Sequence, residues 1–279
     1  MDRLLRRNPL IPKMPWLRNA LRKQYHSFMN SSSSGLSVLV GGVMEVRLPA
    51  EFCSKEIESY EPECVAALNT WIEHNPQGVV IDIGCSFGYL TCAARFKAPT
   101  MPVLAIDADA ESLAIARKIC SLTPNSEKLE LLLGLISPED PNNRDLESTR
   151  KQTADTLASP NVKGDPKRMN YVNLDTKIDF EKLPRISLNT IFQEWPVPAE
   201  SPCIIKCDVE GAEDLVLSGA SEALARDNVT LLLSVHPPYL PKFGSSTEQI
   251  RNRLETAGFA IEVIGIDHEE HWLCQKPAQ

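Results

Sequence analysis

The sequence lacks several features that would assign it to a familiar class of protein. No apolar run among its 279 residues reaches the roughly 18 residues of a membrane-spanning helix. The first 30 residues lack the apolar stretch of a secretory signal. None of the eight cysteines belongs to a CxxC pair, so we expect buried, reduced thiols. These absences predict a cytoplasmic protein with no membrane span.

Positive charge is scarce outside the amino terminus. Residues 1–30 contain seven Lys or Arg and one Asp, whereas the whole chain has a net charge of −8. The rest of the chain is therefore strongly acidic, which argues against a nucleic-acid partner. We expect a basic arm and linker over residues 1–35 and a single domain over residues 36–279.

One stretch organises the chain. Val79–Asp82 is an apolar run rich in β-branched residues, which predicts a buried strand, and a loop containing Gly84 and Gly88 connects it to a helix. Such a loop brings backbone N–H groups and the positive helix end to the carboxyl edge of the sheet, where ligands bind. The next strand, Val103–Ile106, is followed by Asp107, whose carboxylate can accept hydrogen bonds from both hydroxyls of a ribose.

The glycine loop does not fit the dinucleotide pattern. That pattern has glycine at the first, third and sixth positions, which here hold Gly84, Ser86 and Tyr89. The wider loop resembles the first motif of S-adenosylmethionine (SAM) methyltransferases, although a purely structural glycine turn is the alternative. The resemblance implies SAM as the cofactor and a binding site made by Asp82, Gly84, Cys85, Ser86, Phe87, Gly88, Asp107, Ala108 and Asp208.

A second stretch narrows the family. Ile204–Glu213 contains Lys206-Cys207-Asp208-Val209-Glu210-Gly211-Ala212-Glu213, and it is followed by Val216–Ala220 and by Leu231–Pro237. This succession resembles the FkbM-type SAM-dependent methyltransferases, with their patterns Lys-x-Asp-x-Glu-Gly-Ala-Glu, Leu-x-Gly-Ala and Glu-x-His. The chain departs from the family pattern with Asp107-Ala108 in place of Glu-Pro. It also has Leu188-Asn189 in place of Leu-Asp, which removes a carboxylate.

The rest of the sequence predicts an α/β fold. A hairpin is expected over residues 36–48, and a helix over residues 54–74 that Pro62 starts or kinks. Seven strands follow, at Val79–Asp82, Val103–Asp107, Leu129–Leu133, Cys203–Asp208, Leu231–His236, Ala260–Ile266 and Trp272–Gln275. Helices are expected between them at Tyr89–Ala98, Ala110–Leu122, Ala212–Arg226 and Thr247–Ala257.

This alternation requires a mostly parallel sheet with helices on both faces. The close spacing of the last two strands implies a hairpin, hence one antiparallel edge strand. The expected fold is the Rossmann-like seven-stranded sheet of class I methyltransferases. The polar insertion over residues 137–176 interrupts the alternation, and it is interpreted as a surface excursion, with a substrate lid as the alternative.

The strand ends supply the candidate catalytic residues. Asp208 should face the methyl group, and Lys206, on the same side of its strand, either assists it or forms a buried ion pair with it. Glu210 either belongs to the site or caps the next helix, and His236 either acts as general base or simply closes its strand. Asp208, Glu210 and His236 can alternatively hold a divalent cation that lowers the pKa of a hydroxyl.

Two further segments offer less specific candidates for site residues. Tyr60 and Glu61 precede the first sheet strand and are candidates for reaching into the cofactor site, with ordinary helix capping as the alternative. The run His268-Glu269-Glu270-His271 looks like a ligand cluster, but its position between the last two strands favours an exposed acidic turn.

The family resemblance implies a SAM-dependent O-methyltransferase whose acceptor is a hydroxyl on a small molecule or a glycan. One alternative is an RNA 2′-O-methyltransferase that uses Lys206, Asp208 and Glu210. The other alternative is a noncatalytic SAM-binding protein. The oligomeric state and the acceptor itself are not indicated by the sequence.

Overall fold

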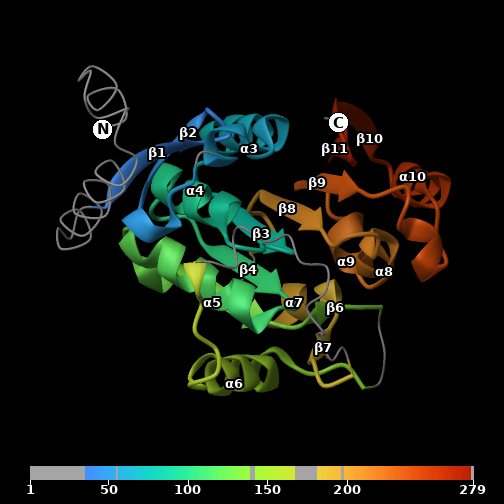
Figure 1. Ribbon diagram of the computed structural model, residues 1–279. Coiled ribbons are helices and arrows are strands. Elements are labelled where there is room, and N and C mark those ends of the chain that lie inside the picture. The colour runs from blue at the N-terminus through green and yellow to red at the C-terminus, as the bar shows by residue number, and fades with distance from the viewer. Residues whose placement is uncertain (1–34, 55, 139–141, 167–180, 196–197, 278–279) are drawn as a thin grey trace.

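The computed structural model describes residues 35–54, 56–138, 142–166, 181–195 and 198–277 (Figure 1). Except for Gly35, the expected basic arm lies outside these residues, as does part of the insertion over 137–176. Among the described helices, none is both long enough and apolar enough to cross a membrane. All eight cysteines are free, and seven of them are buried as expected, whereas Cys53 is partly exposed.

A seven-stranded sheet forms the centre of the molecule, in the order β10-β11-β9-β8-β3-β4-β5. The strands β9, β8, β3, β4 and β5 are parallel, and β11 is antiparallel to both β9 and the edge strand β10. This arrangement confirms the predicted class I methyltransferase sheet. The strand bounds are Val79–Ile83 (β3), Val103–Asp107 (β4), Leu129–Leu133 (β5), Cys203–Asp208 (β8), Val229–Val235 (β9), Ala260–Ile266 (β10) and Glu270–Gln275 (β11).

Alternate residues of each central strand face two separate cores. Val79, Ile81 and Ile83 of β3 belong to one core, and Val80 belongs to the other. The first core is completed by α7 (Leu188–Glu194), α8 (Glu213–Ser218), α9 (Ser221–Ala225) and α10 (Thr247–Thr256). The second core is completed by α3 (Pro62–His74), α4 (Tyr89–Lys97), α5 (Ala110–Ile119) and the hairpin of β1 (Leu36–Val40) and β2 (Met44–Leu48). The sheet is therefore covered on both faces, as the unbroken apolar strands require.

Two predicted helices differ from the structure for local reasons. The helix expected over 54–74 begins only at Pro62, which lacks a backbone N–H and suits the first helical position. The helix expected over 212–226 breaks into α8 and α9 at Gly219. A Cβ on Gly219 would lie 2.2 Å from the Ser137 carbonyl oxygen, and the Gly219 carbonyl accepts the Asn189 N–H. The helix is interrupted at this point, where the Gly219 backbone packs directly against the segments that contain Ser137 and Asn189.

The polar insertion contains a helix that the sequence analysis did not predict. Helix α6 (Leu146–Leu157) is capped by Asp145, whose carboxylate accepts the Ser148 N–H. Its Thr153 hydroxyl accepts the Leu133 N–H at the end of β5, so the helix is attached to the edge of the sheet. The short strands β6 (Leu135–Ile136) and β7 (Arg185–Ile186) pair beside it. The described 3-10 turns are η2 (Ala50–Phe52), η3 (Glu56–Ser59), η4 (Cys120–Leu122), η5 (Ser126–Lys128) and η7 (Leu240–Phe243).

Candidate active site

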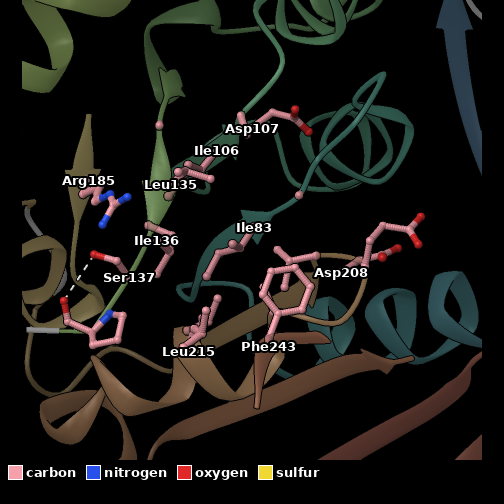
Figure 2. Close-up of a pocket in the computed structure, with 18 residues that line it drawn as sticks. Ile83, Ile106, Asp107, Leu135, Ile136, Ser137, Arg185, Asp208, Leu215 and Phe243 are labelled. Atoms are coloured by element: carbon pink, nitrogen blue, oxygen red, sulfur yellow. Dashed lines mark hydrogen bonds between the residues drawn. The ribbon is translucent and has the colours of Figure 1, made fainter. Parts of the chain in front are cut away.

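A cavity of about 790 Å³ opens at the carboxyl edge of the parallel strands (Figure 2). The ends of β3, β4 and β8 and the loops that follow them supply much of its wall. Arg185 and Asp208 lie on opposite sides of the cavity. The lining is mostly apolar, from Ile83, Ile106, Leu135, Ile136, Pro138, Val209, Leu215, Val216 and Phe243, with Gly84, Asp107, Ala108, Gly134, Ser137, Arg185, Asp208, Glu210 and Ala212 completing it.

The first glycine of the loop after β3 is required by close packing. Gly84 has a φ of 73°, and a Cβ at this position would lie 1.7 Å from the carbonyl oxygen of Asp208. The loop after β3 therefore touches the end of β8 backbone to backbone, which only glycine permits. This contact brings the predicted cofactor loop and the predicted catalytic strand to one wall of the cavity.

Asp107 ends β4 with its carboxylate held by backbone donors. Its Oδ2 accepts the Ser86 N–H at 2.7 Å and its Oδ1 accepts the Asp109 N–H at 2.8 Å. Burial raises the pKa of Asp107 to about 7, and these two hydrogen bonds oppose the rise. Since each carboxylate oxygen accepts more than one hydrogen bond, both oxygens can still accept from a diol.

The other predicted cofactor residues divide into two sets. Gly84, Asp107, Ala108 and Asp208 line the cavity, whereas the remaining predicted positions do not. Asp82 is buried and accepts a hydrogen bond from the Thr91 hydroxyl, and burial raises its pKa to about 6. The residues that do not line the cavity are Asp82, Cys85, Ser86, Phe87 and Gly88.

Asp208 is oriented by Lys206, as the strand alternation predicts. The Lys206 Nζ lies 3.0 Å from Asp208 Oδ2 and 3.4 Å from Glu61 Oε2, and it donates to the Ser234 hydroxyl at 3.2 Å. Burial alone would lower the pKa of Lys206, but Asp208 and Glu61 raise it well above its ordinary value. Lys206 is therefore a buried cation that fixes Oδ2 of Asp208. The other oxygen, Oδ1, lies toward His236. Glu61 points inward to Lys206, but it does not line the cavity.

His236, directly after β9, lies among four carboxylates, and we call these five residues the His236 cluster. Its Nδ1 lies 2.9 Å from Glu213 Oε1, and its Nε2 lies 3.7 Å from Asp208 Oδ1, 3.5 Å from Glu210 Oε2 and 2.7 Å from Glu269 Oε2. The Glu269 oxygen is outside hydrogen-bond geometry with the ring, so the short contact is ionic. Burial would lower the pKa of His236, but the surrounding carboxylates raise it to about 10.

Glu210 is held in an unusual backbone conformation at the edge of the cavity. Its φ is 53°, in the left-handed region that residues other than glycine rarely adopt. Its side chain is 54% exposed and its pKa is raised by burial of the carboxylate against the cavity wall. The carboxylate that caps the following turn is instead that of Glu213, which accepts the Gly211 N–H. The geometry therefore favours a role for Glu210 in the site.

The interpretation of residues 268–271 as an exposed turn is wrong for two of the four residues. Glu269 is 4% exposed and His271 is 1% exposed, whereas the side chain of His268 is 75% exposed. Strand β11 begins at Glu270, two residues earlier than predicted, so the turn is tighter. The Glu269 N–H donates to Asp267 Oδ1, and this turns the Glu269 side chain inward toward His236.

A family model with the description methyltransferase FkbM domain matches residues 78–261, more than half of the chain. The chain belongs to the FkbM methyltransferase family. The match includes the loop after β3, Asp107, and the segment from Lys206 to His236 that carried the resemblance. This family assignment supports the SAM-dependent methyltransferase class. A comparison with curated proteins gave no match.

Solved structures with similar folds are methyltransferases of several kinds. The methyltransferase FkbM from Methylobacillus flagellatus KT has 14% identity and a TM-score of 0.45, over 72% of this chain and 44% of that protein. Precorrin-6y C5,15-methyltransferase from Geobacter metallireducens GS-15 has 11% identity and a TM-score of 0.43, over 81% and 93% of the two chains. TrmK from M. capricolum, solved with S-adenosyl-homocysteine, has 12% identity and a TM-score of 0.38, over 80% and 67%. The chain thus spans less than half of the Methylobacillus protein.

Two members of the His236 cluster were missed by sequence reasoning in this FkbM-family chain. Glu213 lies inside the motif that identified the family, but nothing in that motif indicated that its carboxylate is buried beside His236. Glu269 approaches His236 only because β11 pairs with β9, with Glu270 opposite Val235. A contact that depends on the order of strands in the sheet has no local sequence signal.

Proposed function

We propose that this FkbM-family domain transfers the methyl group of SAM to a hydroxyl of a small molecule or sugar. The observation that carries the proposal is the cavity itself, which is bordered by Asp107 at the end of β4 and by Asp208 at the end of β8. A ribose-binding carboxylate and a polar group for the acceptor are thereby available in one space. The volume of about 790 Å³ is in the range of pockets that enclose drug-sized ligands.

SAM would bind with its ribose at Asp107 and its sulfonium toward Asp208. The two oxygens of Asp107 are already oriented by the Ser86 and Asp109 N–H groups, so little ordering is required when the ribose binds. The absence of a side chain on Gly84 lets the loop after β3 pack against the Asp208 backbone, which keeps these two carboxylates on one wall of the cavity.

Methyl transfer from a sulfonium needs alignment and removal of one proton. The electrophile is already activated, so holding the hydroxyl in line with the methyl group can supply up to roughly 7–11 kcal/mol. We assign this alignment to Asp208, which Lys206 holds in place. General-base assistance, typically about 10²–10⁴-fold, falls to Glu210, which also lines the cavity.

His236 has a different role in this proposal from the general base expected from the sequence. It is 1% exposed and does not line the cavity, so an acceptor hydroxyl there would meet Asp208 or Glu210 first. We propose that His236 is a positioning residue, which holds the carboxylates of Asp208 and Glu210 through its Nε2.

A screen of hydroxyl acceptors for release of S-adenosylhomocysteine tests the proposed function. With an acceptor found, Asp208→Asn and Glu210→Gln should keep the SAM affinity of the wild type and lose turnover by about 10²-fold or more. Glu222→Gln, which changes a partly exposed carboxylate on α9 outside the cavity, is the matched control and should turn over normally. Wild-type turnover in both variants would contradict the assignment, and calorimetry showing NAD binding without SAM binding would contradict the function.

A further inference from the structure

We propose that Asp208, His236 and Glu269 bind a divalent cation of the Mn²⁺ or Mg²⁺ class beside the cavity, behind the part of its wall that Asp208 forms. Its role in catalysis rests on the proposed methyl transfer, whereas its binding does not. One ligand atom from each of the three residues lies within 4.8 Å of the other two. Because Mn²⁺ and Mg²⁺ hold oxygen and nitrogen ligands at about 2.0–2.3 Å, small side-chain shifts would close this set around one ion.

Within the described part of the chain, one buried carboxylate oxygen of this group has an ionic contact with His236 but no hydrogen-bond donor. Glu269 is 4% exposed, and its Oε2, 2.7 Å from His236 Nε2, has no hydrogen-bond donor among the described residues. Buried carboxylate oxygens almost always have such a partner, because burying a charged acceptor without one is costly. A cation between Glu269 and His236 would satisfy this oxygen.

The surrounding residues hold each ligand in the orientation that a cation needs. The Glu213 carboxylate, 0% exposed, lies 2.9 Å from His236 Nδ1, so that Nδ1–H can donate to it. Metal-binding histidines commonly have such a carboxylate behind them. A cation would displace the proton on Nε2 and take the lone pair that then faces Asp208 and Glu269. Lys206 binds Oδ2 of Asp208 and leaves Oδ1, at 3.7 Å from His236 Nε2, free to coordinate.

The local charge also favours a cation. Among the described residues, the carboxylates of Glu61, Asp208, Glu210, Glu213 and Glu269 contact one lysine, Lys206, and three histidines, His236, His268 and His271. Most of these groups are buried, so the excess negative charge is screened poorly by solvent. A divalent cation would offset it. A donor set of one imidazole and two carboxylates, with no thiolate, suits Mn²⁺ or Mg²⁺.

The cation would be reachable from the cavity. Asp208 and Glu210 both line it, so water or the acceptor hydroxyl can complete the coordination shell from that side. A hydroxyl bound to the cation has a lowered pKa. Its proton would pass to Glu210, 3.5 Å from the His236 ring, and the resulting alkoxide oxygen would form the new bond to the methyl carbon as the carbon–sulfur bond of SAM breaks.

The test is a Mn²⁺ titration of the EDTA-treated, dialysed full-length protein, followed by the loss of the free Mn²⁺ signal in electron paramagnetic resonance. We expect one Mn²⁺ per chain, and Glu269→Gln should weaken its binding by at least about tenfold. Glu270→Gln is the matched control, since it makes the same change one residue away, where the carboxylate accepts from Trp272 Nε1 outside the cluster. Circular dichroism shows whether each variant is folded.

Asp208→Asn is a second ligand variant, in case Glu269→Gln does not fold. No Mn²⁺ binding to the wild type at millimolar concentration would overturn the proposal, as would equal Mn²⁺ affinity in the wild type and in the folded ligand variants. Calorimetry with SAM on the same samples separates the two proposals. Mn²⁺ binding without SAM binding would overturn the proposed function alone, and SAM binding without Mn²⁺ binding would overturn the cation site alone.

Discussion

Replacing Asp107 with alanine should weaken SAM binding by two to four orders of magnitude. In the structure each oxygen of Asp107 already accepts one backbone N–H, from Ser86 and from Asp109, and has capacity for one ribose hydroxyl. A hydrogen bond to a charged group contributes roughly 1.5–3 kcal/mol, so two of them contribute about 3–6 kcal/mol. Since about 1.4 kcal/mol corresponds to a tenfold change, the expected loss is roughly 10²–10⁴-fold.

Isothermal calorimetry with SAM and with S-adenosylhomocysteine measures this loss directly. Asp109→Ala is the comparison, because its side chain caps α5 through the Ser112 N–H and should affect stability more than cofactor affinity. A SAM affinity of Asp107→Ala within threefold of the wild type would show that the ribose binds elsewhere, and the placement of the cofactor would be wrong.

The same residue predicts the pH dependence of binding. Burial raises the pKa of Asp107 to about 7, so the carboxylate becomes protonated as the pH falls through neutrality. If ribose binding needs the ionised form, SAM affinity should fall about tenfold per pH unit below 7 and level off above it. Asp107→Asn should bind more weakly and lack this pH limb. The free energy of unfolding depends on pH in the opposite direction. The raised pKa of Asp107 contributes most to this free energy below about pH 4, and the contribution is lost as the pH rises from 4 to 7.

Four further predictions follow from the same geometry. Gly84→Ala should destabilise the protein and abolish SAM binding, since its Cβ would meet the Asp208 carbonyl, whereas Gly258→Ala, with equally positive φ and open space, should bind SAM normally. Arg95→Met should lower the free energy of unfolding in urea by about 3 kcal/mol or more, because the buried guanidinium donates to four backbone carbonyls. Glu210→Gly should relieve a left-handed φ, keep the melting temperature at or above the wild-type value, and lose turnover. Turnover should change little between low and moderate salt, and a steep fall would instead favour an RNA acceptor.

The strand ends were predictable from the sequence because their signals are local. An apolar run that stops at a glycine or a carboxylate marks both the strand and its carboxyl edge, and Gly84, Asp107 and Asp208 were found in this way. All seven strands of the central sheet were predicted within two residues of their bounds. Helix α6 was missed because its few apolar residues, among them Leu146 and Leu157, are too sparse to reveal an amphipathic pattern.

The inner part of the site depends on contacts that no local pattern encodes. Glu269 was interpreted as exposed because it lies in the predicted turn between the last two strands, yet the pairing of β11 with β9 carries it to His236. Glu213 was known as part of a motif, but its contact with His236 depends on the position of β9, which brings that histidine beside α8. Such contacts follow from the order of strands in the sheet, which periodicity does not provide.

Backbone strain points to the same edge of the sheet as the charges do. Among the described residues, four other than glycine have a left-handed φ, and three of them, Glu61, Ser86 and Glu210, belong to this site. A non-glycine residue in that conformation costs about 1–2 kcal/mol, and such a cost persists only where the surrounding structure imposes it. Each of the three presents a polar group inward: Glu61 to Lys206, the Ser86 N–H to Asp107, and Glu210 to His236. The loops at this edge are therefore held by their polar contacts against their own backbone preferences, as a preorganised binding site requires.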